Sequence, residues 1–227
     1  MKGYDEASIR ADLQEYLGRQ RGLISPEFSQ VVADVSLFTS AISRCGLQIA
    51  LSQSAAFRNV DPGSPFIEVA ETIVRHHIRF IREAERDIVR KSLLEAYTHA
   101  AGPQYILEPF SKTLLVKSLS RSGSSRKFVT MFFSLYVFNL ISMGVHDDLR
   151  GRVPDEKSFQ LYMSRVEAIC CDAVTAAVKR QRGEVDETWA TAVARSVEEQ
   201  LLHFDVKPSN SHFPILTGSE NDLRTHR

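Results

Sequence analysis

The sequence predicts an all-α protein, a single-domain bundle of about seven helices with a central apolar helix and an irregular C-terminal tail. Apolar residues recur at intervals of three and four nearly everywhere, and sustained alternation of apolar and polar residues is absent. One segment near the middle is apolar on every face, which is typical of a buried helix. The length of 227 residues suits one large domain. We expect a helical domain over residues 1–204 and an extended or disordered tail over 205–227.

Composition narrows the class of protein. The chain has 28 Lys and Arg residues and 28 Asp and Glu residues, so its formal net charge is zero. This balance argues against nonspecific binding of nucleic acid, which depends on excess positive charge. The three cysteines do not suggest a disulfide framework, because two of them are adjacent, and the N-terminus lacks the apolar region of a secretory signal. A cytoplasmic location is therefore the expectation.

The first two helices are predicted over about 5–20 and from residue 26 to about residue 57. Ser25 is a good N-cap and Pro26 suits the first helical position, where no N–H is needed. A seam of apolar residues at alternating intervals of four and three then follows. Its members are Val31, Val35, Phe38, Ile42, Cys45 and Ile49. The seam could pack within its own bundle or against a second copy, so a homodimer is one expectation.

The same start signal, Ser64 followed by Pro65, begins a third helix that is expected to run toward Ala101, with or without a break near Lys91. A fourth helix is expected over about 104–120. The sixth and seventh helices follow the turn-forming stretches "GRVPDE" and "RGEVDE". Their apolar stripes contain Phe159, Tyr162, Val166, Ile169, Ala173 and Ala176, and then Trp189, Val193, Val197, Leu201 and Phe204.

The fifth helix, expected over about 126–144, contains eighteen uncharged residues from Phe128 to Val145. Eighteen residues are near the lower limit for a membrane span. The other predicted helices are amphipathic and need a shared core. We therefore expect this helix at the centre of the bundle and not in a membrane.

A His–Asp pair follows this apolar helix, and such a pair resembles the signature of the HD-domain phosphohydrolases. The family is all-helical, and its metal ligands occur in the order His, His-Asp, Asp. The ligands that the resemblance implies are His77 (or His76), His146, Asp147 and Asp172. They would hold a divalent metal that activates a water molecule. The alternative interpretation, which we favour, is the polar end of a buried helix that stops near Gly144, with no metal and no cofactor.

Neighbouring histidines and cysteines are not predicted to form joint sites. On one continuous helix, His77 lies on the apolar stripe and His76 points about 100° away, so the two cannot easily hold one ion. We expect His77 to be a core residue with one hydrogen-bond partner. By the same reasoning, Cys170 faces an apolar stripe and is expected to be a small buried residue.

Arginines form the sharpest pattern in the chain. Arg75, Arg79, Arg82, Arg86 and Arg90 are spaced by four, three, four and four. On a continuous helix they share a face of about 80°. Such a face can bind carboxylate or phosphate groups, because the guanidinium group matches both. It can also be a solvated face with ion pairs to nearby glutamates. Lys112, Lys117, Arg121, Arg126 and Lys127 could extend a basic surface.

These patterns lead to three functional hypotheses. The first is a non-catalytic interaction or regulatory protein that binds a protein partner or anionic ligand, acidic or phosphate-bearing, through the arginine face. The second is a metal-dependent hydrolase of the HD type. The third is a sensor for a small apolar ligand, with a pocket lined by Phe132, Phe133, Tyr136 and Phe138. We take the first as the leading hypothesis.

Overall fold

The computed structural model confirms the all-α fold. It describes residues 6–19, 22–53, 57, 60–61, 63–77, 83–103, 106–109, 114–119, 123–150, 153 and 155–202. These residues contain nine helices and no β-strand. The helices are α1 (Glu6–Gly18), α2 (Pro26–Cys45), α3 (Leu47–Gln53), α4 (Phe66–His76), α5 (Glu83–Ala101), α6 (Leu114–Leu119), α7 (Ser124–Arg150), α8 (Glu156–Arg180) and α9 (Glu187–Leu202).

The number of helices exceeds the predicted seven because two predicted helices are divided. Gly46 has a φ of 84° and forms the C-cap of α2, so the second helix ends there and α3 begins one residue later. The third predicted helix is divided into α4 and α5, and His77 is the C-cap of α4. The alternative break near Lys91 does not occur, since Lys91 lies inside α5.

Helix α7 is the central helix, as the sequence predicts. It packs against α2, α5, α6 and α8. The aromatic rings of Phe128, Phe132, Phe133 and Tyr136 are almost completely buried.

Among the described residues, Ser124–His146 is the one stretch long and apolar enough to cross a membrane, and 67% of its most apolar window is buried inside the protein. The core helix of a folded domain passes the same test, so this stretch is weak evidence for a membrane span.

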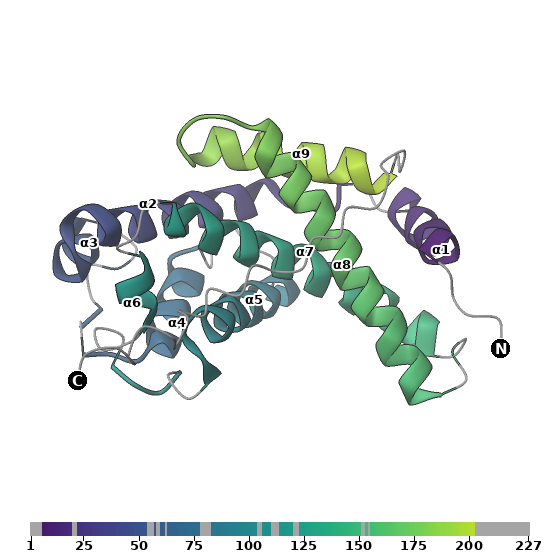
Figure 1. Cartoon of the computed structure of the whole chain (residues 1–227), viewed down its shortest axis with the longest axis horizontal. Helices are drawn as coiled ribbons and strands as arrows, with labels where there is room; N and C mark the ends of the chain where they lie inside the picture. Colours follow the sequence, from purple (N-terminus) through teal and green to yellow (C-terminus); the bar gives the residue numbers. More distant parts are fainter. Residues whose placement is uncertain are drawn as a thin grey trace, which may run out of the picture.

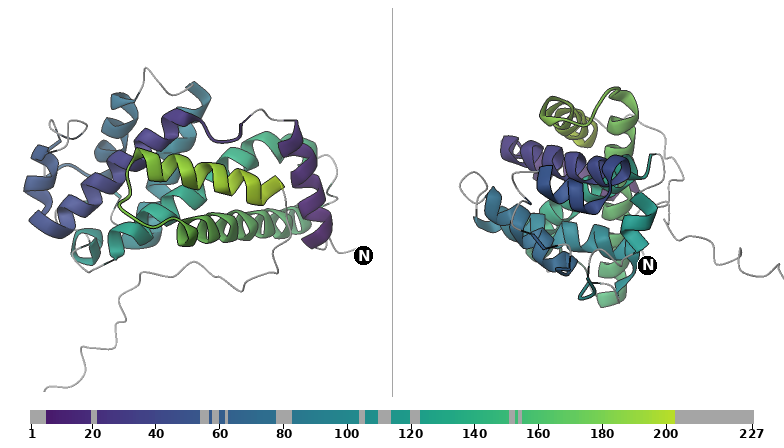
Figure 2. Two further views of the ribbon diagram at one scale, coloured as in Figure 1. Left: turned by 90° about the horizontal axis from the view of Figure 1, so that it is seen from above. Right: turned by 90° about the vertical axis from the view of Figure 1, so that its left-hand side faces the viewer.

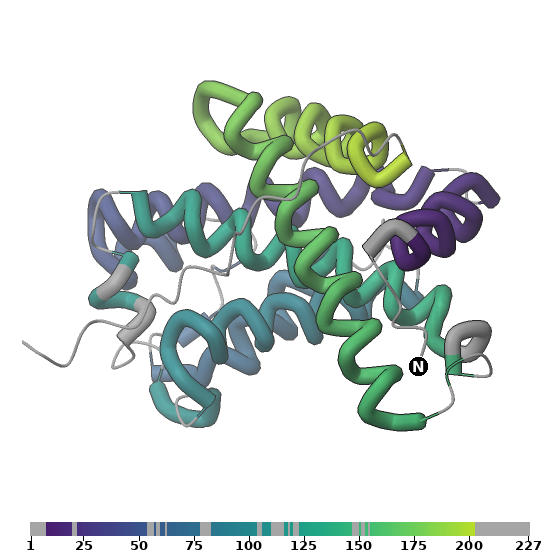
Figure 3. The backbone as a smooth tube through the Cα atoms, turned by 45° about the vertical axis from the view of Figure 1, so that its right-hand side comes forward, coloured from purple at the N-terminus to yellow at the C-terminus, as the bar shows by residue number. Residues whose placement is uncertain are grey.

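The helices surround α7 on several sides. Figure 1 shows α8 crossing in front of α7 and α9 lying across the top, with α1 at one end and α3 and α6 at the other. The view from above places α1 and α3 at opposite ends in the same way (Figure 2). A short turn joins α8 to α9, and the two helices then pack together (Figure 3).

The apolar seam of α2 belongs to this core. Its first four members, Val31, Val35, Phe38 and Ile42, are buried within the chain's own bundle, whereas Cys45 and Ile49 are exposed. The start of α2 is as predicted, because the Ser25 side chain accepts a hydrogen bond from the Phe28 N–H and Pro26 is at the first position. The predicted tail, 205–227, lies outside the described residues.

Candidate functional site

The arginines of the predicted face do not share one continuous helix. Arg75 lies in the last turn of α4, whereas Arg86 and Arg90 lie in α5. Arg79 and Arg82 fall outside the described residues. The helical wheel that aligned all five assumed that residues 65–90 form a single helix, and the end of α4 at His76 removes that assumption.

Arg90 is held by carboxylates of its own chain. Its guanidinium group donates to Glu71 of α4 over 3.0 Å and to Asp87 of α5 over 2.6 Å. The hydrogen bond and the charge of Glu71 raise the pKa of the Arg90 guanidinium. Arg90 therefore ties α5 to α4, and its ion pairs are of the kind expected for a solvated face.

Arg75 and Arg86 differ in their surroundings. Arg86 is half-buried and interacts with other groups of the chain. Arg75 is exposed, and its guanidinium group makes no hydrogen bond or ion pair with another residue that the structure describes. Within the described part of the predicted face, Arg75 is thus the arginine whose guanidinium is available to an external anion.

Arg126 and Lys127, which were proposed to extend the basic surface, differ in their contacts. Arg126 donates to the carbonyl oxygens of Val178 (3.1 Å) and Gln181 (2.5 Å) and lies over the ring of Trp189. It therefore satisfies carbonyl groups at the end of α8. Lys127, one residue later, is exposed.

His77 occupies the position predicted for it. It is only 4% exposed, and its Nε2 lies 3.0 Å from Oδ2 of Asp34 on α2. The prediction of a core histidine with a hydrogen-bond partner is confirmed. The partner could not have been named from the sequence, since the two residues are 43 positions apart.

His76 is exposed and His77 is buried, which agrees with the helical wheel, and their two rings nevertheless lie close to each other. The two rings are 5.1 Å apart and nearly perpendicular. One ligand atom from each of Asp34, His76 and His77 lies within 4.8 Å of the other two. The offset of about 100° between adjacent helical residues therefore does not keep the ligand atoms of the two long side chains apart.

Two of the HD-like residues, His146 and Asp172, lie outside this group. His146 is exposed, and its ring contacts the ring of Phe159 on α8 at 5.2 Å. Asp172 is half-buried on α8, and the side chain of Asp147 is outside the described set. Among the described side chains, the group of three at Asp34, His76 and His77 is the one close enough to share a metal ion, and it contains neither His146 nor Asp172.

The prediction that the fifth helix ends near Gly144 is wrong. Helix α7 continues to Arg150. The phenol of Tyr16 on α1 lies so close to Gly144 that a Cβ atom there would overlap its oxygen and Cζ. Gly144 is therefore explained by the close approach of another side chain.

The sequence did not predict that Glu85 is a buried carboxylate. Glu85 is 7% exposed and accepts hydrogen bonds from the hydroxyl groups of Ser25 and Tyr136. The Tyr136 ring stacks on Phe28 at 3.4 Å, so the contacts join α2, α5 and α7. Glu85 falls on the buried side of α5, and a prediction that began this helix at Glu83 would have placed it there.

A second polar cluster lies where α7 meets α5 and α8. Asn139 donates to Ser92 (3.1 Å) and to Glu95 (2.7 Å), and its buried Oδ1 has no hydrogen-bond partner in the described structure. Burial raises the pKa of Glu167, the negative charge of Glu95 adds to this, and His99 acts in the opposite direction. Glu95 and His99 are thus near the same carboxyl group, as their spacing of four residues allows.

The cysteines have two environments. Cys45 is exposed, whereas Cys170 and Cys171 are buried. Burial raises the pKa of both buried thiols. The prediction that Cys170 is a small buried residue is confirmed.

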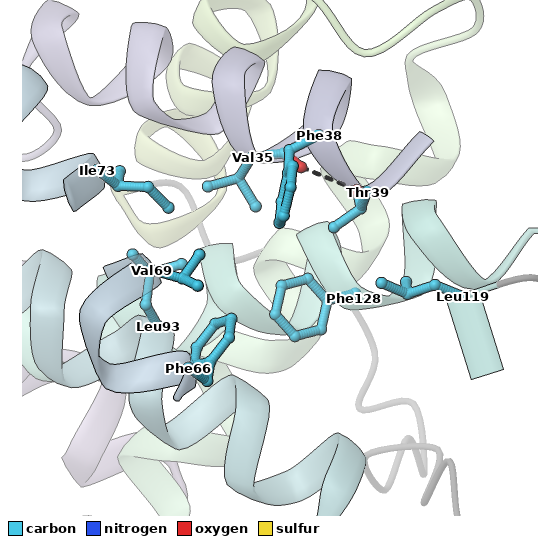
Figure 4. Close-up of a pocket in the computed structure, with 9 residues that line it drawn as sticks. All are labelled: Val35, Phe38, Thr39, Phe66, Val69, Ile73, Leu93, Leu119 and Phe128. Carbon is cyan, nitrogen blue, oxygen red and sulfur yellow. Dashed lines mark hydrogen bonds between the residues drawn. The ribbon is translucent and has the colours of Figure 1, made fainter. Parts of the chain in front are cut away.

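Of the residues proposed for an apolar pocket, Phe132, Phe133 and Tyr136 are buried in the core and Phe138 is partly buried against it. Phe132 and Phe133 contact Phe28 at ring distances of 5.5 and 5.1 Å. A different cavity lies between α2, α4 and α7 and is lined by Val35, Phe38, Thr39, Phe66, Val69, Ile73, Leu93, Leu119 and Phe128 (Figure 4). Its free volume is about 10 Å³, which is room for about one water molecule.

Comparison of the chain with family models, with curated proteins and with solved structures gave no match. The resemblance to HD-domain hydrolases therefore rests on the His146–Asp147 dipeptide and its placement after an apolar helix.

Proposed function

We propose that this protein is a non-catalytic helical interaction protein that binds an acidic or phosphate-bearing partner through a surface centred on Arg75. The observation that carries the proposal is the exposure of Arg75 without a partner among the described residues. A guanidinium group in this situation can form two parallel hydrogen bonds to an external carboxylate or phosphate.

The neighbouring arginines have different parts in this proposal. Arg90 is fixed by Glu71 and Asp87 and stabilises the contact between α4 and α5. Arg79 and Arg82 lie on the chain between Arg75 and α5, so they contribute positive charge close to Arg75 in sequence. The proposed binding surface is therefore the C-terminal end of α4, where Arg75 lies.

Binding of labelled acidic peptides tests the proposal. The full-length protein would be titrated into a fluorescein-labelled octaglutamate peptide and into a matched peptide with two phosphoserines, and anisotropy would be measured. We expect Arg75→Ala to weaken binding about tenfold, the effect of losing about 1.4 kcal/mol of interaction. Arg75→Lys should restore part of the affinity, because lysine keeps the charge but not the planar fork.

Arg195→Ala is the matched control, because Arg195 is an exposed arginine on α9. It should leave the affinity unchanged. Binding to both peptides should also weaken at 1 M salt, where charges are screened over about 3 Å. Equal affinities for the wild type and Arg75→Ala, or equal losses in both alanine variants, would rule out a site at Arg75.

A further inference from the structure

Asp34, His76 and His77 have the composition and placement of a metal site. We infer that these three residues bind one divalent transition-metal ion of the zinc class. The inference is independent of the proposed function, because it does not require Arg75 or an anionic partner.

The geometry is close to what such an ion requires. Nε2 of His77 and Oδ2 of Asp34 are 3.0 Å apart, and a ligand atom of His76 completes a group whose members lie within 4.8 Å of one another. Two ligands bound at about 2.0–2.1 Å with tetrahedral angles are about 3.3 Å apart. The His77–Asp34 pair is therefore already near its final spacing, and the ligand atom of His76 needs to approach the other two by up to about 1.5 Å.

The environment permits that movement and the entry of an ion. His77 is buried, the Asp34 side chain is 27% exposed, and His76 is exposed. The site consequently has a fixed inner side and an open outer side. Because His76 is on the open side, its ring can rotate toward the ion without disturbing the core.

The end of α4 also favours a cation. The last carbonyl groups of a helix carry a partial negative charge, and positive groups are stabilised within the final turn. His76 is the last residue of α4 and His77 is its C-cap. The carboxylate of Asp34 adds a full negative charge from α2, so an ion here would be attracted by both elements.

The ligand set indicates the class of metal. Imidazole nitrogens with one carboxylate suit zinc, cobalt, nickel and ferrous iron, and they are poor ligands for calcium and magnesium, which prefer oxygen. Three protein ligands leave a fourth position for water or an external group. An ion on Nε2 of His77 would take the place of the hydrogen bond between His77 and Asp34, with the imidazole proton on Nδ1.

Zinc titration of the full-length protein without an affinity tag tests the inference. The background would be Cys45→Ser, which removes an exposed thiol that could bind zinc. Isothermal titration calorimetry should show one equivalent of bound Zn²⁺, and zinc should raise the midpoint of thermal unfolding, because an ion that binds only the folded state stabilises it. His76→Gln and Asp34→Asn should each weaken binding at least tenfold and abolish the zinc-dependent rise in midpoint.

Two matched controls make the result specific. His146→Gln removes another exposed histidine that contacts an aromatic ring, and Arg195→Ala changes an exposed residue on α9. Both should bind zinc like the parent. His76 is exposed, so His76→Gln should fold normally, which circular dichroism would verify. Failure of the parent to bind zinc, or equal binding by His76→Gln, would overturn the inference, as would loss of binding in His146→Gln.

Discussion

Gly144 shows how one residue can be misinterpreted from sequence. Glycine after a long apolar run predicts a helix end, yet α7 passes through this position and continues to Arg150. The space that a Cβ atom would occupy is taken by the phenol of Tyr16 from α1. The absence of a side chain at Gly144 therefore allows α1 to pack against α7.

This contact gives a prediction whose sign depends on Tyr16. In the wild type, Gly144→Ala should lower the free energy of unfolding by about 1 kcal/mol, because the overlap with Tyr16, typically 1–3 kcal/mol, exceeds the gain in helix propensity, about 1 kcal/mol. In a Tyr16→Ala background the overlap is gone, so the same substitution should stabilise the protein by about 1 kcal/mol. Urea unfolding of the four proteins measures both effects.

The single variant Tyr16→Ala is the control for this comparison. Tyr16→Ala alone removes contacts of a partly buried ring and should destabilise the wild type, whereas in the Gly144→Ala background it also relieves the overlap and should cost about 2 kcal/mol less. If Gly144→Ala has the same sign with and without Tyr16, then the close approach of the phenol is not the reason for glycine at this position.

At the scale of the element, the N-cap of α8 couples helix stability to pH. Oδ1 of Asp155 accepts from the Ser158 N–H over 2.9 Å, and Oδ2 accepts from the Ser158 hydroxyl over 2.8 Å. These hydrogen bonds, the backbone one first, lower the pKa of Asp155. The stabilisation is therefore complete above the unfolded-state pKa of about 3.9 and is lost as pH falls through the lower folded-state value.

Asp155→Asn tests this coupling, because asparagine is also a good N-cap but does not titrate. We expect the wild type to be the more stable protein at pH 6 and the difference to shrink as the pH falls below about 4. Chemical denaturation at a series of pH values measures the difference. An NMR titration in which the Asp155 carboxyl has a pKa at or above 3.9 would contradict the prediction.

The start of α2 was predicted correctly, whereas the Ser64 cap predicted for the next helix is absent, because Pro65 is the N-cap of α4 and no side chain caps it. Ser25 and Pro26 marked the start of α2 because capping is a local property of adjacent residues. The end of α2 at Gly46 was missed because the apolar spacing continues through it to Ile49. The end of α4 at His76 was missed for the same reason, and this error aligned the arginines on one wheel.

At the scale of the whole molecule, periodicity predicted the core and not the contacts. The position of α7 followed from its composition, since a helix that is apolar on all faces must be enclosed. The contacts of the candidate sites join residues that are distant in the chain, such as Asp34 with His77 and Ser25 with Glu85. No local rule specifies which carboxylate a buried histidine or hydroxyl group will meet, so these sites required the structure.

The rate at which the three cysteines react with a thiol reagent should report the unfolding of the protein, because one is exposed and two are buried. Cys45 should react with a thiol reagent such as DTNB at once, because it is exposed. Cys170 and Cys171 should react only when α8 separates from the core. The thiolate is the reactive form, and burial of these two thiols both shields them and raises their pKa. We expect one fast and two slow equivalents by absorbance, with the slow phase accelerating in urea. Three fast equivalents in the native protein would contradict this. The slow phase would give the rate of global opening without an engineered probe.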